Sequence, residues 1–121
     1  MPTAELTAPV ILGAGPVGRT IAQCLVAAGH EPRVLTKSGT ALPGTKPVAV
    51  DRTNLEATTE AVRGADVLFH CAPPASHRWP QDFPPLLRAI LGAAEKVGAG
   101  VVASETTYAY GRVSGPMTES T

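Results

Sequence analysis

The sequence has 121 residues, with ten lysines and arginines against ten aspartates and glutamates, so its formal net charge is zero. A chain of this length can form one domain with its own core, and the lack of a basic surplus gives no reason to expect nucleic acid or an anionic membrane as a partner. Hydrophobic residues make up 44% of the chain but aromatic residues only 4%, which predicts an aliphatic core like that of a parallel sheet covered by helices. Residues 1–7 lack a basic or apolar signal segment, and no apolar run approaches membrane-spanning length, so a cytoplasmic protein is expected.

The first predicted strand, Ala8 to Leu12, runs directly into Gly13-Ala14-Gly15-Pro16-Val17-Gly18, a turn with the spacing G-x-G-x-x-G. In dinucleotide-binding folds the first glycine makes the tight bend, the second lets the backbone approach a pyrophosphate, and the third lets the next helix lie close to the sheet. A lone match can also be a plain structural bend, but here a strand precedes it and a helix pattern follows. We therefore expect the whole turn, Pro16 and Val17 included, to bind a dinucleotide.

A helix is predicted after the turn, because Val17, Ile21, Leu25 and Ala28 recur at helical spacing and Gly29 stands where the helix should end. The N-terminus of such a helix presents free N–H groups and a partial positive charge. The turn and the helix together predict a phosphate-binding site.

The second predicted strand, Arg33 to Thr36, ends in Thr36-Lys37-Ser38. A dinucleotide fold commonly has an acidic residue here, which binds the ribose 2′-hydroxyl of NAD. No carboxylate is present, whereas an ammonium group between two hydroxyls suits a 2′-phosphate, with Lys37 as the charge and Thr36 and Ser38 as hydrogen-bond donors. This pattern favours NADP over NAD; the alternative is that Lys37 is a solvated lysine at a strand end.

The third predicted strand, Pro47 to Val50, is closed by Asp51. Because the carboxyl ends of parallel strands face the ligand crevice, Asp51 could accept a hydrogen bond from an adenine amino group. It could equally serve as a helix cap, since Asp51, Thr53 and Asn54 are each suitable N-caps for a helix from Leu55 to Val62.

The fourth predicted strand, Ala65 to Ala72, is stopped by Pro73-Pro74. We expect a long loop from Ala72 to Pro85, in which Ala72 and Pro73 lie near the cofactor. This loop could flank the nicotinamide half of the cofactor, or it could be only an exposed connection.

An apolar stripe from Leu86 to Val97 predicts a third helix ended by Gly98, and Gly100 to Ala103 is the fifth predicted strand. Strands and helices therefore alternate along the chain. With right-handed crossovers, this alternation predicts a three-layer, doubly wound parallel sheet with strand order 3-2-1-4-5 and a ligand crevice between strands one and four.

The cysteines and histidines give no sign of a metal site or a disulfide. Cys24 and Cys71 are expected to be buried, reduced thiols. His30, His70 and His77 have no metal-ligand spacing with the cysteines.

Four segments in this order resemble the NAD-dependent epimerase/dehydratase family, the extended and atypical branch of the short-chain dehydrogenase/reductases. They are the turn at 13–18, Asp51 after the third strand, Val67 to Ala72, and Ser104-Glu105-Thr106-Thr107-Tyr108-Ala109-Tyr110-Gly111. The resemblance spans about Val10 to Glu119 and implies a Rossmann fold that binds NAD(P). It also implies that Thr106 matches the family's catalytic serine or threonine; the alternative is a hydroxyl that satisfies the backbone at a strand end.

Three features depart from the family pattern. Extended members usually carry G-x-x-G-x-x-G, which would place a glycine at Leu12, and the usual His-x-Ala-Ala is here His70-Cys71-Ala72-Pro73. The family's Tyr-x-x-x-Lys pair is missing, because Tyr108 and Tyr110 are followed four residues later by Arg112 and Ser114. Without that pair no group passes the proton, so hydride chemistry by these residues alone is expected to be negligible.

Two functional hypotheses follow. The first is an NADP(H)-binding domain of an epimerase-, dehydratase- or reductase-like enzyme. In this hypothesis the domain spans residues 1–121, with its core in 8–104 and a C-terminal segment at 105–121. It ends after the fifth strand and lacks the substrate lobe. The second is a non-enzymatic Rossmann module that senses a nucleotide or binds another protein. In either case the exposed edge of the sheet could support a homo-oligomer.

Overall fold

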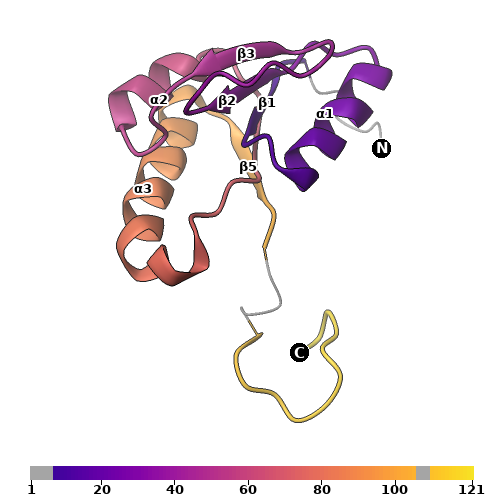
Figure 1. Ribbon diagram of the computed structural model, residues 1–121, viewed down its shortest axis with the longest axis vertical. Coiled ribbons are helices and arrows are strands. Elements are labelled where there is room, and N and C mark those ends of the chain that lie inside the picture. Colours follow the sequence, from indigo (N-terminus) through magenta and orange to yellow (C-terminus); the bar gives the residue numbers. More distant parts are fainter. Residues whose placement is uncertain (1–6, 106–109) are drawn as a thin grey trace.

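The sheet is built around its first strand. The computed structural model describes residues 7–105 and 110–121. β1 (Pro9–Leu12) is buried at all four positions and pairs in parallel with β2 (Arg33–Thr36) and with β4 (Val67–His70). β3 (Lys46–Ala49) lies outside β2, and β5 (Gly100–Ala103) lies outside β4. The order β3-β2-β1-β4-β5 confirms the predicted doubly wound Rossmann-like sheet (Figure 1).

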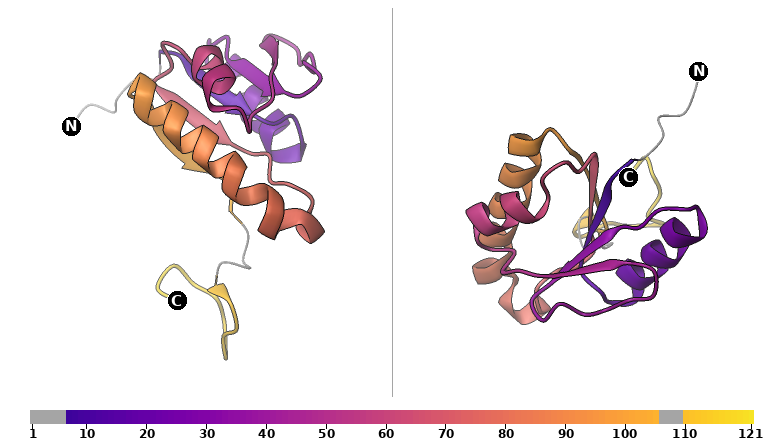
Figure 2. Two further views of the ribbon diagram at one scale, coloured as in Figure 1. Left: turned by 90° about the vertical axis from the view of Figure 1, so that its left-hand side faces the viewer. Right: turned by 90° about the horizontal axis from the view of Figure 1, so that it is seen from above.

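Helices cover both faces of this sheet. α1 (Pro16–Ala27) lies on one face, and α2 (Leu55–Ala61) and α3 (Trp79–Val97) pack together on the other (Figure 2). Because successive side chains of a strand point to opposite faces, Val10 and Leu12 join the cluster under α2 and α3, whereas Ile11 joins the cluster under α1. Each such side chain contributes about 2 kcal/mol by its burial, so these two aliphatic clusters hold the three layers together.

The main correction concerns the segment between Ala72 and Pro85, which is not an open loop. A 3₁₀ turn (Ser76–Arg78) leads into α3, which begins at Trp79, seven residues before the predicted start at Leu86. Pro80 lies in the first helical turn, where a backbone N–H has no intrahelical partner, but Pro84 and Pro85 lie inside the helix.

Side-chain contacts around the start of α3 offset the free-energy cost of these prolines in a helix. The Trp79 indole N–H donates a hydrogen bond to the Pro74 carbonyl oxygen at 2.8 Å, and the Trp79 and Phe83 rings pack edge to face at 5.3 Å. Arg78 and Asp82 form an ion pair at 3.1 Å across the helix start. The prolines therefore led to the prediction of a loop in a segment where side-chain packing maintains a helix.

Smaller differences concern caps and burial. Of the three N-cap candidates for α2, Asn54 is the cap, because its side-chain oxygen accepts a hydrogen bond from the Ala57 N–H at 2.9 Å. Cys24 is exposed, contrary to the prediction, whereas Cys71 is buried and its burial raises the pKa of the thiol. Among residues 7–105 and 110–121, no helix is long and apolar enough to cross a membrane, and no three metal-ligating side chains gather in one place.

Candidate functional site

The three glycines of the turn are not equivalent. Gly13 has φ of +111°, and a Cβ at this position would lie 2.6 Å from the Ala72 Cβ. A Cβ on Gly18 would overlap the Gly13 carbonyl oxygen, so α1 can begin this close to the turn only if Gly18 is glycine. Gly15 has an ordinary φ of −76°, and a Cβ there would meet no atom of the described residues within 4 Å. The protein's own packing therefore requires glycine at 13 and 18 but not at 15.

Gly15 is also the N-cap of α1, and no side chain caps this helix. The first intrahelical bond runs from the Arg19 N–H to the Gly15 carbonyl oxygen at 2.9 Å, and Pro16 at the first helical position has no N–H of its own. The first turn of α1 contains no acidic residue that would neutralise the helix dipole. This N-terminus keeps the partial positive charge that favours a phosphate group.

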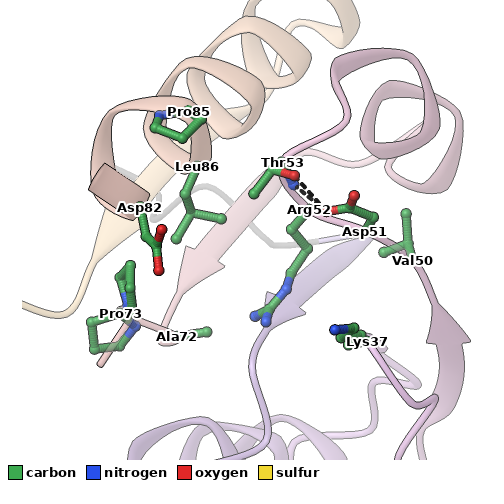
Figure 3. A pocket seen from close by; sticks show the side chains of 11 residues that line it. Lys37, Val50, Asp51, Arg52, Thr53, Ala72, Pro73, Asp82, Pro85 and Leu86 are labelled. Carbon is green, nitrogen blue, oxygen red and sulfur yellow. Dashed lines mark hydrogen bonds between the residues drawn. The ribbon is translucent and has the colours of Figure 1, made fainter. Parts of the chain in front are cut away.

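A cleft of about 540 Å³ opens beside the turn, at the carboxyl edge of the sheet. Figure 3 shows the side chains that line it, which come from the ends of β2, β3 and β4 and from the start of α3. The lining residues are Lys37, Val50, Asp51, Arg52, Thr53, Ala72, Pro73, Pro74, Asp82, Pro85 and Leu86. The cleft lies between the ends of β3 and β4, so it extends beyond the crevice predicted between β1 and β4.

Four residues selected from the sequence meet in this cleft, namely Lys37, Asp51, Ala72 and Pro73. Thr36 and Ser38 do not line it. The Thr36 hydroxyl oxygen accepts a hydrogen bond from the Thr40 N–H at 2.9 Å, and the Ser38 and Thr40 hydroxyls are 3.3 Å apart. These hydroxyls therefore order the loop after β2, and Lys37 is the residue of this trio that faces the cleft.

The Asp51 carboxylate is held by Thr53. Its Oδ1 accepts hydrogen bonds from the Thr53 hydroxyl at 2.6 Å and from the Thr53 N–H at 3.0 Å, which are the bonds drawn as dashed lines in Figure 3. These hydrogen bonds lower the pKa of Asp51, with smaller contributions from the charges of Lys37 and Arg52. Asp51 is therefore a carboxylate at neutral pH and terminates β3 with a side-chain turn.

Arg52 is the cleft residue that the sequence analysis missed. Its Nη1 is buried and has no hydrogen-bond partner among the described residues, and burial lowers the pKa of the guanidinium. In Figure 3 the guanidinium lies in the middle of the cleft, between Lys37 and Ala72. A signal was available, because Arg52 comes three residues after the end of β3, at the edge of the sheet where side chains face the crevice.

His70 lies at the carboxyl end of β4, next to this cleft. It is 3% exposed, its ring packs edge to face on Phe83 at 6.5 Å, and its Nδ1 has no hydrogen-bond partner among the described residues. Burial and the charge of Arg52 lower the pKa of His70, and Glu105 acts weakly in the opposite direction. His70 is therefore neutral at pH 7.

Thr106, the candidate catalytic residue, lies outside the described residues, as does Tyr108. β5 leads toward that segment, and the Ser104 N–H donates to the His70 carbonyl oxygen at 2.9 Å beyond the end of the strand pairing. The structure thus brings Lys37, Asp51, Ala72 and Pro73 together in the cleft and leaves the catalytic role of Thr106 as a prediction.

Comparison with known structures finds the same fold in sugar-nucleotide enzymes. UDP-N-acetylglucosamine 4-epimerase from Bacillus cereus aligns over 94% of this chain and 40% of its own, with 19% identity and a TM-score of 0.77. A protein from Methylobacillus flagellatus described as an NAD-dependent epimerase/dehydratase aligns over 97% and 44%, with 24% identity and a TM-score of 0.74. MoeE5, solved with UDP-glucose and NAD, aligns over 93% and 41%, with 22% identity and a TM-score of 0.72. The predicted resemblance to epimerase/dehydratases is thus confirmed for the fold.

The chain spans less than half the length of each of these proteins. A search among curated proteins finds no match. At the level of sequence families, one model matches residues 10–103, which run from β1 to the end of β5 and include the glycine turn and the whole cleft. Through this dinucleotide-binding Rossmann domain, the chain belongs to the family described as NADP oxidoreductase, coenzyme F420-dependent.

Proposed function

We propose that this chain is the NADP(H)-binding domain of an oxidoreductase, epimerase or dehydratase. The observation that carries the proposal is the open space at Gly15. A glycine that the protein's own packing does not require, set at an uncapped helix N-terminus, is what close approach of a pyrophosphate demands. In this proposal residues 8–104 form the folding unit and 105–121 a C-terminal segment.

The cofactor would extend from the turn into the cleft. The pyrophosphate is held by the turn formed by Gly13, Gly15, Pro16, Val17 and Gly18, through the free N–H groups at the start of α1. The adenosine lies in the cleft, where Ala72 and Pro73 form an apolar wall and Asp51 is an acceptor for the adenine amino group. When bound, the cofactor supplies hydride chemistry; the chain's own residues bind and orient it.

The preference for NADP over NAD rests on the end of β2. Lys37 faces the cleft there, and no carboxylate occupies the place where an NAD-specific fold has one. Thr36 and Ser38 order the loop around Lys37, and their role as hydrogen-bond donors to the 2′-phosphate stays a prediction. The description of the matching family names NADP, while MoeE5 was solved with NAD.

The 121-residue chain by itself is proposed to bind the cofactor without transferring hydride. Thr106 keeps its predicted role as the hydroxyl that would hydrogen-bond the substrate oxygen. Tyr108 and Tyr110 are followed four residues later by Arg112 and Ser114, so no lysine stands where it would lower a tyrosine pKa. NADPH oxidation by the purified chain with a carbonyl substrate would contradict this part of the proposal.

Calorimetric titration with NADP and with NAD tests the proposal. We expect saturable binding that Gly15→Val weakens about tenfold or more, because a branched side chain fills the space for the phosphate. Gly100→Val is the matched control: Gly100 is at the amino end of β5, away from the carboxyl-edge cleft, and a Cβ there meets its nearest atom at 3.9 Å. A folded chain that bound neither nucleotide would sink the proposal.

The second candidate, an interaction module, is favoured by the edge strand β5. Val102 on this strand is 52% exposed, and β5 pairs with β4 on one side only. An apolar, unpaired strand edge favours self-association. If this candidate holds, light scattering shows a homo-oligomer that Val102→Lys dissociates; a strict monomer at high concentration would count against it.

A further inference from the structure

The cleft contains two positively charged side chains that have no direct ion-pair partner among the described residues, although the Asp51 carboxylate attracts both of them at longer range. Lys37 and Arg52 both line it, and neither forms an ion pair within residues 7–105 and 110–121. The two acidic residues that line the cleft are engaged by other groups. Asp51 accepts two hydrogen bonds from Thr53, and Asp82 pairs with Arg78 on the same helix at 3.1 Å.

Arg52 differs from Lys37 in its surroundings. Lys37 is exposed, so water solvates its ammonium group, whereas the Nη1 of Arg52 is buried without a partner. A guanidinium stays protonated in proteins, so this charge cannot be relieved by loss of a proton. Arg52 is half-buried, and a buried N–H donor without an acceptor is costly, so an anion that enters the cleft and accepts from Nη1 would offset that cost.

The anion must be separate from the pyrophosphate if the proposed function holds. The pyrophosphate occupies the N-terminus of α1, whereas Arg52 lies in the loop between β3 and α2, on the adenosine side of the cleft. An additional phosphate on the adenosine half is the feature that distinguishes NADP from NAD. The planar guanidinium can donate two parallel hydrogen bonds to a phosphate, which an ammonium group cannot do.

We infer that Arg52, rather than the end of β2 alone, is the specificity-determining residue for the 2′-phosphate, with Lys37 completing a two-cation site. This inference rests on the proposed function and deepens it. The buried, unpartnered Nη1 and its position in the cleft carry the assignment. Arg52 selects NADP over NAD because only NADP brings the anion that its guanidinium lacks.

The test is the ratio of the NAD and NADP dissociation constants of the purified chain, measured by calorimetry. We expect Arg52→Gln to weaken NADP binding about tenfold or more and to change NAD binding by less than about twofold. Lys37→Gln should reduce the same ratio by a smaller factor, because an exposed ammonium group is already well solvated. Arg63→Gln is the matched control, since it removes an arginine that pairs with Glu60 on the surface of α2.

Two further measurements test the inference without relying on Arg52→Gln. Arg52→Lys keeps the positive charge but cannot donate two parallel hydrogen bonds to one phosphate. Its affinity for NADP should therefore lie between that of the wild type and that of Arg52→Gln. On the wild type, adenosine 2′,5′-bisphosphate should bind more tightly than AMP, and its affinity should fall more steeply with added salt.

The outcomes separate the two proposals. Equal loss of NADP and NAD affinity in Arg52→Gln would overturn the inference, because Arg52 would then act on the shared adenosine. An unchanged ratio in Arg52→Gln would also overturn it while leaving the proposed function standing. A wild type that binds NADP and NAD equally would overturn both this inference and the proposed preference for NADP, and would leave only dinucleotide binding. If the wild type bound neither nucleotide, the proposed function and this inference would both fall.

Discussion

The glycine turn and the adjacent cleft lie at the same edge of the sheet, but different contacts fix their geometry. Gly13 and Gly18 are required by backbone and side-chain atoms of the protein itself, so this part of the turn has its shape without a ligand. The cleft instead has a buried guanidinium nitrogen on Arg52, and a buried ring nitrogen on His70 lies next to it; neither atom has a hydrogen-bond partner within the described residues. The turn therefore has its internal contacts complete as folded, whereas the region of the cleft has buried polar atoms that the proposed ligand would satisfy.

The largest expected effect is on the glycine turn. Gly18→Ala should lower the free energy of unfolding by about 3 kcal/mol or more, because the new Cβ would overlap the Gly13 carbonyl oxygen and force α1 away from the turn. Gly15→Ala should change the free energy of unfolding by less than about 1 kcal/mol, because its Cβ meets no atom and its φ is ordinary. Urea denaturation of both variants measures the contrast.

Equal stability losses at Gly15 and Gly18 would contradict this distinction. They would mean that the protein's own packing also requires glycine at position 15. The space at Gly15 would then need no ligand to explain it.

The sequence predicted those parts of the fold and of the cleft that depend on local patterns. The strand order and the meeting of Lys37, Asp51, Ala72 and Pro73 were predictable, because alternating strands and helices dictate a parallel sheet whose carboxyl ends share one edge. Each of these residues lies within three residues of the end of a strand, so its position follows from the local strand pattern. The glycine spacing is likewise a local constraint on the backbone.

The parts that were missed depend on specific side-chain contacts, which the periodicity of strands and helices does not reveal. The start of α3 at Trp79 is supported by the Trp79 contacts with Pro74 and Phe83, which local rules for proline do not include. The direction of Arg52 is set where Asp51 and Thr53 close a side-chain turn around it. Burial of its guanidinium further requires that the start of α3 form the opposite wall of the cleft.

A medium effect tests whether the cleft is incomplete without a ligand. Arg52→Met keeps the aliphatic stem and removes the unpaired charge, so the free energy of unfolding without cofactor should rise by about 1 kcal/mol. In excess NADP the wild type should instead be more stable than Arg52→Met, because the wild type gains more stability from a ligand that it binds more tightly. Thermal unfolding with and without NADP measures both arms, and Arg63→Met, which alters an exposed ion pair, is the control.

A destabilised Arg52→Met variant in the absence of cofactor would contradict this expectation. It would show that the Arg52 side chain stabilises the fold through contacts of its own. The contrast between a complete turn and an incomplete cleft would then be lost.

The smallest effect concerns His70 and pH. Burial and then the charge of Arg52 lower the pKa of His70 below its ordinary value of 6.5, so the unfolded chain takes up this proton at a higher pH than the folded chain does. The contribution of His70 to stability is therefore constant above pH about 6.5 and becomes unfavourable as the pH falls through 6.5 toward the lowered pKa. Urea denaturation at a series of pH values should show a loss of stability over this window that His70→Gln removes and His77→Gln does not.

Because Arg52 supplies part of the shift in the His70 pKa, Arg52→Met should raise that pKa, as followed by NMR of the His70 ring protons. The pH range over which stability is lost should then become narrower. Identical pH profiles for the wild type and His70→Gln would show that the pKa of His70 does not fall on folding, and an unchanged His70 pKa in Arg52→Met would show that the histidine is not coupled to the cleft.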